Sequence, residues 1–292
     1  MGALISVIMM IWRCREAIFD LSREGVIMGI LNVTPDSFSD GGHFDSPKRA
    51  VRQVEKMLQE GAGIIDIGGE STRPGATEVG EAEETGRVIP VIEEVLCQFP
   101  ETCISIDTSK PSVAREALAA GACIINDVTG FSQKKMIALA VESQAGIVVM
   151  HMRGVPETMQ KNPSYHNVTH EVRAFFRQRH QLLLNARINP ETIVYDPGIG
   201  FGKTLEHNLH LLRDLDRLPI AGRPILLGAS RKSFIGKVLQ SDKMEDRSAA
   251  TVTITTSARE KGVMLHRVHE VGSNYQALRM TEAVLHAQSK EG

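Results

Sequence analysis

Residues 29–42 read Gly29-Ile-Leu-Asn-Val-Thr-Pro-Asp-Ser-Phe-Ser-Asp-Gly-Gly42 and follow directly on the apolar run Val26-Ile27-Met28. The combined run predicts a buried strand that ends where the chain turns polar, at Asn32. Pro35 and the glycine pair at 41–42 indicate a long turn after this strand. Polar loops at the carboxyl ends of buried strands form the active sites of α/β proteins. A solvated connection would explain one such stretch equally well, so its meaning depends on whether the pattern recurs.

The same change from an apolar run to a polar, often glycine-bounded loop recurs along the chain. The predicted strands are Val26–Leu31, Gly63–Ile67, Cys103–Ile106, Cys123–Ile125, Ile147–Met150, Ile193–Tyr195, Ile225–Gly228 and Val263–Leu265. Helical patterns follow several of them, at residues 46–61, 81–96, 111–121, 168–187 and 274–287. Eight strand–helix units in 292 residues predict an α/β protein with a closed (β/α)8 barrel. An open doubly wound sheet is the alternative, but no G-x-G-x-x-G motif follows the first strand.

Composition and charge narrow the class of partner. The chain is 42% hydrophobic and 23% charged, and its net charge is -2, so it has no electrostatic footprint for nucleic acid. The four cysteines are scattered and form no C-x-x-C pair, which argues against a disulfide framework or a zinc site. Cysteine usage of this kind is typical of a reducing compartment, and we expect a cytoplasmic protein.

The first 24 residues stand apart from the strand–helix pattern. The apolar run Ala3–Trp12 is short for a membrane span, and its charges, Arg13 and Arg15, follow the run instead of preceding it as in a signal peptide. We therefore expect no membrane association. We interpret residues 1–24 as an extension, a short strand or hairpin that plugs the bottom of the barrel, and residues 25–292 as one barrel domain.

A parallel barrel brings the carboxyl ends of all its strands to one face. In this chain that face would collect ten polar side chains: Asn32, Asp66, Asp107, Asn126, Asp127, His151, Asp196, Lys232, Arg267 and His269. Each has a simpler explanation when taken alone. Asp66 and Asp127 could be helix caps, and His151 could be a packed core histidine. Helix capping does not readily explain why ten polar groups would lie together at the carboxyl ends of the strands, so a binding site is the better interpretation.

The residue types indicate the chemistry of the ligand. Asp107, Asn126 and Asp196 would suit a planar heterocycle that presents N–H donors, and Lys232 would donate to a carbonyl on the same ring. Arg267 and His269 lie two residues apart on a strand and therefore point the same way. With the loop donors Ser71, Thr72 and Arg73 they form a basic corner suited to phosphate.

Asn32 offers an oxygen ligand for Mg²⁺, which usually keeps water and phosphate oxygens as its other ligands. The sequence has no His/Cys cluster for zinc and no serine nucleophile elbow. Taken together, these residues indicate a transferase or lyase that acts on a heterocycle carrying a phosphate leaving group.

Seven blocks of the sequence resemble the signature blocks of the dihydropteroate synthase family, a pterin-binding TIM-barrel family. They are Gly29–Gly42, Asp66–Gly75, Ile106–Ser109, Ile125–Val128, Asp196–Lys203, Ser230–Ser233 and Arg267–His269. The resemblance runs from about Gly25 to the end of the chain. It implies a folate-pathway enzyme that joins 6-hydroxymethyl-7,8-dihydropterin diphosphate to p-aminobenzoate and releases diphosphate. It also implies competitive inhibition by sulfonamides and a homodimer, for which the last helices are the expected interface.

The resemblance further implies roles for individual residues. The pterin would be held by Asp107, Asn126, Met150, Asp196, Phe201 and Lys232. The diphosphate would be held by Asn32, Thr72, Arg267 and His269, with Asn32 also binding Mg²⁺. The p-aminobenzoate pocket would be lined by Phe38, Pro74, Lys232 and Ser233. The catalytic set would comprise Asp36, Phe38, Arg73, Lys232 and Arg267.

A mechanism follows from these roles. The bond to diphosphate would break early, in an SN1-like step, and leave a cation delocalised into the dihydropterin. Arg267 and His269 would stabilise the departing charge, and Asp36 could stabilise the cation while loop closure excludes water. One departure from the family is Glu270, which stands where Asp is usual after the histidine. We expect it to cause local repacking without loss of activity.

Two other functions are compatible with part of the pattern. A pterin-binding domain that moves a methyl group from a methylated folate to a corrinoid would share the strand-end Asp and Asn residues. It has no use for the blocks at 71–74 and 230–232. A non-catalytic pterin-binding module is the second alternative, but the intact loop residues argue against it; they are Asp36, Ser37, Phe38, Arg73 and Pro74.

Overall fold

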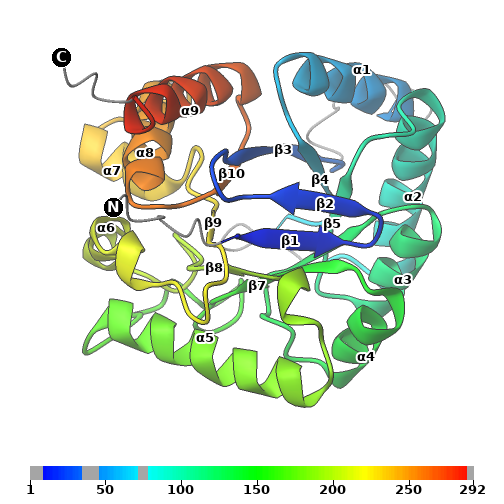
Figure 1. The fold of residues 1–292 in the computed structure, drawn as a ribbon, viewed down its shortest axis with the longest axis horizontal. Helices are drawn as coiled ribbons and strands as arrows, with labels where there is room; N and C mark the ends of the chain where they lie inside the picture. The colour runs from blue at the N-terminus through cyan, green and yellow to red at the C-terminus, as the bar shows by residue number, and fades with distance from the viewer. Residues whose placement is uncertain (1–8, 35–45, 72–77, 288–292) are drawn as a thin grey trace, which may run out of the picture.

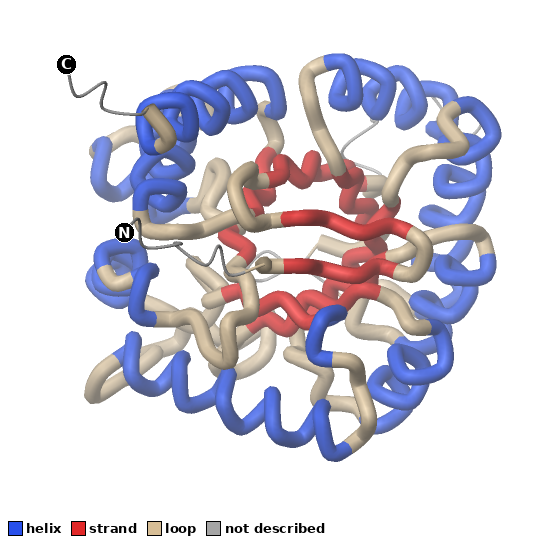
Figure 2. Tube along the Cα trace, viewed as in Figure 1, coloured by secondary structure: helices blue, strands red, loops and turns tan. Residues whose placement is uncertain are grey.

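The computed structural model describes residues 9–34, 46–71 and 78–287. Its centre is a sheet of eight parallel strands in the order β8-β7-β6-β5-β4-β3-β10-β9. These strands are β3 (Val26–Asn32), β4 (Ile64–Gly68), β5 (Ile104–Asp107), β6 (Ile124–Asp127), β7 (Gly146–Met150), β8 (Ile193–Asp196), β9 (Leu226–Leu227) and β10 (Leu265–Val268). A parallel bridge between Tyr195 and Ile225 joins the two outer strands of this order and closes the barrel. The predicted (β/α)8 barrel is therefore confirmed and the open sheet is excluded (Figure 2).

The register of the strands aligns their carboxyl ends. Asn32 pairs with Gly68, Gly68 with Asp107, and Asp107 with Asn126, through successive strands of the barrel. Met150 pairs with Asp196 in the same way. The polar residues that end the strands therefore lie at one rim, because every strand runs in the same direction.

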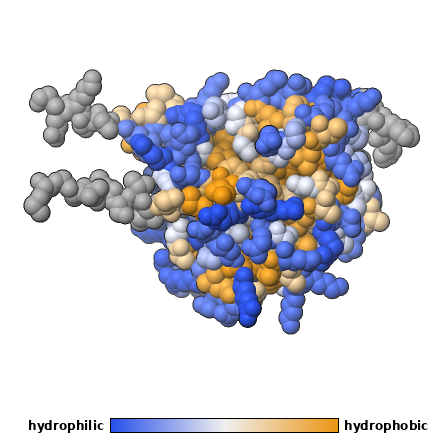
Figure 3. All heavy atoms as spheres, turned by 45° about the vertical axis from the view of Figure 1, so that its right-hand side comes forward, coloured by the Kyte–Doolittle hydropathy of each residue, from blue (hydrophilic) through white to orange (hydrophobic). Residues whose placement is uncertain are grey.

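Helices surround the barrel (Figure 1). Their bounds are α1 (Ser46–Gln59), α2 (Glu81–Gln98), α3 (Pro111–Ala119), α4 (Lys134–Ser143), α5 (Val168–Asn185), α6 (Leu205–Arg213), α7 (Ser233–Leu239), α8 (Arg247–Glu260) and α9 (Val271–Leu285). Their apolar faces pack on the outer side of the strands and form the main core. Within the described residues, no helix combines the length and the apolar character needed to cross a membrane. On the face that carries α1 to α4, apolar patches lie among mostly hydrophilic side chains (Figure 3).

The predicted strand boundaries differ from the structure at one or both ends of every strand, mostly by one residue, and they differ most in the last strand. The last strand was expected at Val263–Leu265, but β10 begins at Leu265, because the backbone N–H of Val263 still donates to Ala258 O at the end of α8. The seventh strand, expected at Ile225–Gly228, pairs as a strand only at Leu226–Leu227. The shortening of the seventh strand, by one residue at each end, lies within the range over which the ends of elements vary between definitions, whereas the end of the last strand is displaced by three residues.

An antiparallel hairpin, β1 (Ile11–Cys14) and β2 (Ala17–Asp20), crosses the end of the barrel opposite the strand carboxyl ends (Figure 1). Trp12 is fully buried there, and its indole Nε1–H donates to Thr192 O at 2.9 Å. Arg223 donates to Ile11 O at 2.6 Å. The apolar side chains of the hairpin join the inner core of the barrel. The N-terminal segment therefore forms a hairpin, one of the two forms expected, and it closes the bottom of the barrel.

Candidate active site

The rim of the barrel holds a compact group of charged side chains. Arg267, on β10, donates from Nε to Asp66 Oδ2 and from Nη2 to Asp107 Oδ2, each at 2.6 Å. Asn126 Nδ2 lies 3.3 Å from Asp66 Oδ2. A Cβ added at Gly228 would lie 3.4 Å from Asp196 Oδ2 and 3.8 Å from Arg267 Cδ. The predicted meeting of strand-end residues is thus observed, on a scale of a few ångströms.

Asp66 holds the centre of this group. Its side chain is fully buried and accepts from Arg267 Nε and Asn126 Nδ2, which are side-chain donors and not the backbone N–H groups of a helix N-terminus. Burial alone lowers the pKa of Arg267, but the charges of Asp66 and Asp107 outweigh burial and raise it above its ordinary value. The guanidinium is therefore charged and fixed in direction. Sequence reasoning placed Asp66 at the rim but assigned it no role in the site.

Asp107 keeps one oxygen available. Oδ2 accepts from Arg267, whereas Oδ1 is buried and has no hydrogen-bond partner among the described residues. Burial raises the pKa of Asp107 to about 7, against the opposing effect of Arg267 and with a further rise from the Asp66 charge. A buried acceptor without a partner is costly unless a ligand satisfies it. Asp107 Oδ1 is therefore suited to accept from an N–H of a bound ring.

Asp196 and Lys232 form a second pair. Asp196 Oδ1 accepts from the backbone N–H of Gly198 at 2.7 Å, and burial raises the pKa of Asp196 although Lys232 opposes the rise. Burial lowers the pKa of Lys232 to about 7, with Asp196 acting against this shift and Arg267 adding to it. Lys232 Nζ donates to Ile199 O and lies 4.1 Å from the centre of the Phe201 ring. Phe201 therefore lies against Lys232, and Met150 is paired in register with Asp196, so each polar group of this pair has an apolar or aromatic residue beside it.

Lys203 stabilises the loop that contains Phe201 by hydrogen bonds to its backbone. The buried Nζ donates to Gly198 O at 2.8 Å and to Phe201 O at 3.0 Å, and it lies 3.0 Å from His151 Nδ1. Burial, together with the charge of Lys203, lowers the pKa of His151 to about 2, so the imidazole is neutral and can accept from Lys203. His151 is therefore a packed histidine at the rim. Lys203 was missed in the sequence, although its place at the end of a glycine-rich block was a signal.

Asp127 does not belong to the site. Its carboxylate accepts from Thr129 N and Thr129 Oγ1, both at 2.8 Å, and from Phe131 N at 3.0 Å. It therefore stabilises the turn after β6. The helix cap expected as the alternative for Asp127 is not observed, because α4 begins at Lys134 and its N-cap residue is Gln133.

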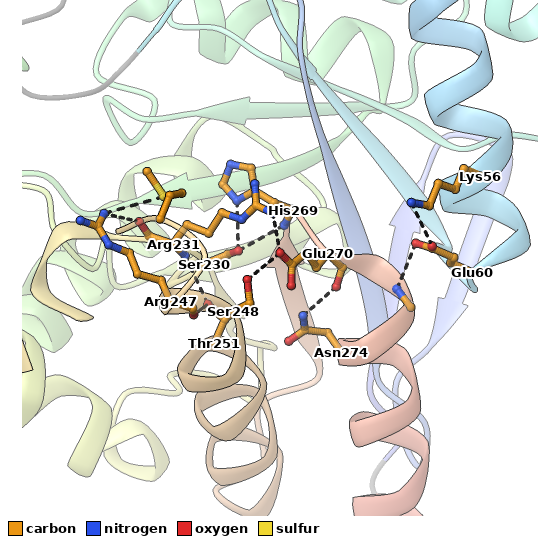
Figure 4. A network of polar contacts seen from close by, with 12 residues as sticks. Lys56, Glu60, Ser230, Arg231, Arg247, Ser248, Thr251, His269, Glu270 and Asn274 are labelled. Carbon is orange, nitrogen blue, oxygen red and sulfur yellow. Dashed lines mark hydrogen bonds and ion pairs between the residues drawn. The ribbon is translucent and has the colours of Figure 1, made fainter. Parts of the chain in front are cut away.

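The expected phosphate corner is described in part. Asn32 ends β3 and is half-buried. His269 lies beside Ser230, with Nδ1 3.0 Å from Ser230 Oγ. Glu270 pairs with Arg231 and accepts from Ser248 Oγ at 2.6 Å (Figure 4). Burial would raise the pKa of Glu270, but these hydrogen bonds lower it. The longer acid thus ties the loop 230–233 to the end of β10 by local contacts.

Five predicted site residues, Asp36, Phe38, Thr72, Arg73 and Pro74, lie outside the described residues. Ser233 begins α7 and is exposed at the rim. The residues on either side of positions 72–77 are described.

Glu70 links the described residues on the two sides of residues 72–77. Its Oε1 accepts from Val79 N at 2.7 Å, and its Oε2 pairs with Lys110 Nζ at 2.8 Å. Lys110 also pairs with the fully buried carboxylate of Glu84 at 2.6 Å. Sequence reasoning did not identify this network, because its members come from three separate segments that only the barrel brings together.

The residues present fit a magnesium ion only in part. The described residues contain no group of three or more His, Cys, Asp or Glu side chains that could hold a metal. Asn32 offers a single amide oxygen at the rim. Mg²⁺ prefers oxygen ligands and often takes most of them from water and substrate phosphates, so this donor is compatible with an ion that binds together with a diphosphate.

A closed parallel barrel with converging, partly unsatisfied polar groups at its strand carboxyl ends defines an enzyme of the (β/α)8 class. Residues 28–269 match the family described as pterin binding enzyme. The dihydropteroate synthase of Haemophilus influenzae is 46% identical over 261 residues, covering 89% of this chain and 94% of that protein. The chain therefore belongs to the dihydropteroate synthase family of pterin-binding enzymes.

Solved structures agree with this assignment. The Yersinia pestis dihydropteroate synthase, described in complex with a sulfonamide drug, has a TM-score of 0.89 and 40% identity, covering 95% of this chain and all of that one. The Xanthomonas albilineans dihydropteroate synthase, described with 4-aminobenzoic acid, has a TM-score of 0.89 and 41% identity, covering 96% of this chain and all of that one.

Proposed function

We propose that the protein is a dihydropteroate synthase. It condenses 6-hydroxymethyl-7,8-dihydropterin diphosphate with p-aminobenzoate to give 7,8-dihydropteroate and diphosphate, a transferase reaction of folate biosynthesis. The observation that carries the proposal is the buried acceptor Asp107 Oδ1, which faces the rim without a partner among the described residues, in a chain of this family. A pterin ring offers the N–H donors that this oxygen requires.

In this proposal Asp107, Asn126 and Asp196 accept from the ring nitrogens and the amino group of the pterin, and Lys232 donates to its carbonyl. Met150 and Phe201 pack on the faces of the ring. Support comes from the network around Arg267, which fixes Asp107 and Asn126 before any ligand arrives. A fixed set of acceptors favours one orientation of a flat ligand.

The diphosphate would lie toward Asn32, Thr72, Arg267 and His269. Arg267 and His269 stabilise negative charge on the departing oxygens, and the pairing of His269 with Ser230 orients the imidazole. Asn32 would hold Mg²⁺, which when bound would add positive charge beside the leaving group. Asp36 would stabilise the cation left on the pterin. The roles given to Asp36, Phe38 and Arg73 follow from the family resemblance alone.

The second substrate and the inhibitors would share one subsite. We assign p-aminobenzoate to a pocket lined by Phe38, Pro74, Lys232 and Ser233, and we expect sulfonamides to compete for it. Similarity to the Yersinia pestis and Xanthomonas albilineans proteins supports both assignments.

We further propose a cytoplasmic homodimer that pairs through the last helices. Met280 and Val284 on α9 are 65% and 63% exposed, and Val238 on α7 is 52% exposed. Apolar side chains exposed on the helices near the C-terminus would suit such an interface. Sedimentation of the purified protein should give twice the mass of one chain.

One assay tests the activity. Purified protein is supplied with 6-hydroxymethyl-7,8-dihydropterin diphosphate and Mg²⁺, and diphosphate release is followed with and without p-aminobenzoate. We expect release that depends on p-aminobenzoate and is lost in Asp107→Asn. Pterin binding without release would indicate a non-catalytic module, and methyl transfer from a methylated folate to a corrinoid would indicate the methyltransferase alternative.

A further inference from the structure

Two cysteines face each other at the end of the barrel opposite the candidate active site. Cys103 directly precedes β5 and Cys123 directly precedes β6, and these two strands are neighbours in the sheet. The two Sγ atoms are 2.6 Å apart. The backbone of both residues is held by the sheet: Ile65 N donates to Cys103 O, and Cys123 N donates to Ile104 O. The thiols are therefore positioned by rigid elements on both sides.

The surroundings make the two thiols unequal. Arg15, in the turn of the hairpin, donates to Leu118 O and Ala122 O and so places its guanidinium next to Cys123. The hydrogen bond from Cys103 lowers the pKa of Cys123 against the effect of burial, and Arg15 adds to the lowering. The same hydrogen bond, followed by burial, raises the pKa of Cys103. The pKa of the Cys123 thiol is thus the lower of the two, which favours Cys123 as the nucleophile and Cys103 as its resolving partner.

Small oxidants can reach this pair. Cys123 is half-buried, and Cys103 lines a cavity of about 430 Å³ together with Leu58, Ala62, Phe99, Pro100 and Thr102. The nearby Cys14, the last residue of β1, is fully buried, and Cys97 is exposed on α2. The reduced pair is also well accommodated, because the thiol of Cys123 can donate to Ile104 O at 3.4 Å.

We propose that Cys103 and Cys123 form a reversible oxidation site, at which hydrogen peroxide generates a disulfide between β5 and β6. The Cys123 thiolate attacks one peroxide oxygen; the O–O bond breaks, an S–O bond forms, and hydroxide leaves. The Cys103 sulfur then attacks the Cys123 sulfur; the S–S bond forms and the S–O bond breaks. The hydroxyl group leaves as water with the Cys103 thiol proton. One peroxide is reduced, and each sulfur is oxidised by one electron.

The cysteine pair lies at the end of the barrel opposite the candidate active site, where residues contribute to stability and not to catalysis. A bond there closes a loop of about 20 residues and restricts the unfolded chain, so the oxidised protein should melt at a higher temperature, by roughly 5 °C. A thiol-reducing agent should return the melting temperature to that of the reduced protein.

Peptide mapping of the native protein tests the pairing. Reduced protein should titrate four thiols after denaturation, and protein exposed to a small excess of hydrogen peroxide should titrate two. Cleavage after Glu101 and Arg115 separates the peptides of Cys97, Cys103 and Cys123. We expect one cross-linked product that joins the peptides of Cys103 and Cys123, two hydrogens lighter than their sum and split by dithiothreitol.

Single cysteine variants test which thiols form the cross-link. Cys97→Ser should still form the cross-link, whereas Cys103→Ala and Cys123→Ala should not. Mapping of the unchanged protein decides the matter even if a buried substitution impairs folding. A cross-link that includes Cys14 or Cys97, or conversion of Cys123 to sulfinic acid with Cys103 still a free thiol, would overturn the proposal. An unchanged melting temperature of the cross-linked protein would refute the stabilising effect.

Discussion

Arg267 shows how a single residue organises the candidate site. It lies between Asp66 and Asp107, and both contacts depend on residues that are 201 and 160 positions away in the chain. The sequence could place all three at the rim, because each ends or nearly ends a core strand. It could not show which of them pair, because pairing depends on which inner positions face each other across the closed barrel.

Removal of the negative charge of Asp66 should lower the activity, even though the substituted side chain has nearly the same shape. Asp66→Asn keeps the shape but leaves Arg267 with one carboxylate instead of two. Loss of a partner from a buried charge pair costs about 3–5 kcal/mol of stability. Arg267, held by one carboxylate only, should also adopt a different orientation. We expect p-aminobenzoate-dependent diphosphate release to fall at least about tenfold. Asp127→Asn is the matched control: it should lower the melting temperature and leave turnover within about twofold, because Asp127 only stabilises a turn.

Two residues of the site titrate near neutrality, and this predicts a pH optimum for pterin binding. Burial raises the pKa of Asp107 to about 7, so below this pH the acceptor becomes protonated. Burial lowers the pKa of Lys232 to about 7, so above this pH the donor loses its charge. Affinity for 6-hydroxymethylpterin, measured by calorimetry between about pH 5.5 and 8.5, should therefore peak near the middle of this range. Lys232→Met should remove the alkaline limb and Asp107→Asn the acidic limb; a flat profile in the unchanged protein would contradict the assignment.

At the scale of elements, the strands were easier to predict than the helices. Each strand is an apolar run that ends at a polar residue, and this pattern can be recognised in the sequence because the strands form the core of the barrel. Helix α8 gave no such signal because it is rich in threonine, a poor helix former. Its hydroxyls bond back along the helix, Thr251 to Arg247 O and Thr253 to Ala249 O. Tertiary packing, and not local propensity, maintains this helix.

The network of Glu70, Lys110 and Glu84 should influence p-aminobenzoate binding, because Glu70 lies next to residues 72–77, which include the predicted pocket residue Pro74. Lys110→Met leaves the buried Glu84 carboxylate without its partner and should lower the free energy of unfolding by about 3 kcal/mol. Because Glu70 would also lose its link to α3, we expect KM for p-aminobenzoate to rise at least about fivefold. Pterin affinity should change little. Glu84→Gln with Lys110→Met removes both charges of the buried pair and should recover most of the stability but not KM, which separates anchoring from folding.

At the scale of the whole molecule, the two ends of the barrel have different tasks. The strand carboxyl ends carry unsatisfied and charged groups, which cost stability, whereas the opposite end is covered by the hairpin and packed with apolar side chains. This division is general in barrels of this class. The sequence indicated that residues 1–24 belong at the bottom, but it could not distinguish one strand from a hairpin, because the two strands have only four residues each.

This division predicts that the hairpin can be weakened without loss of chemistry. Trp12→Ala removes the largest fully buried side chain and leaves Thr192 O without its indole donor. The free energy of unfolding in urea should fall by about 3–5 kcal/mol. Ile18→Ala, on the same hairpin but 56% exposed, should change it by less than about 0.5 kcal/mol. Diphosphate release per folded molecule should stay within about twofold in both variants, because no contact links the hairpin to Asp107, Asp196 or Lys232 among the described residues. A selective fall in turnover for Trp12→Ala, at temperatures where the protein remains folded, would show that the floor of the barrel positions the rim and that the two ends are coupled.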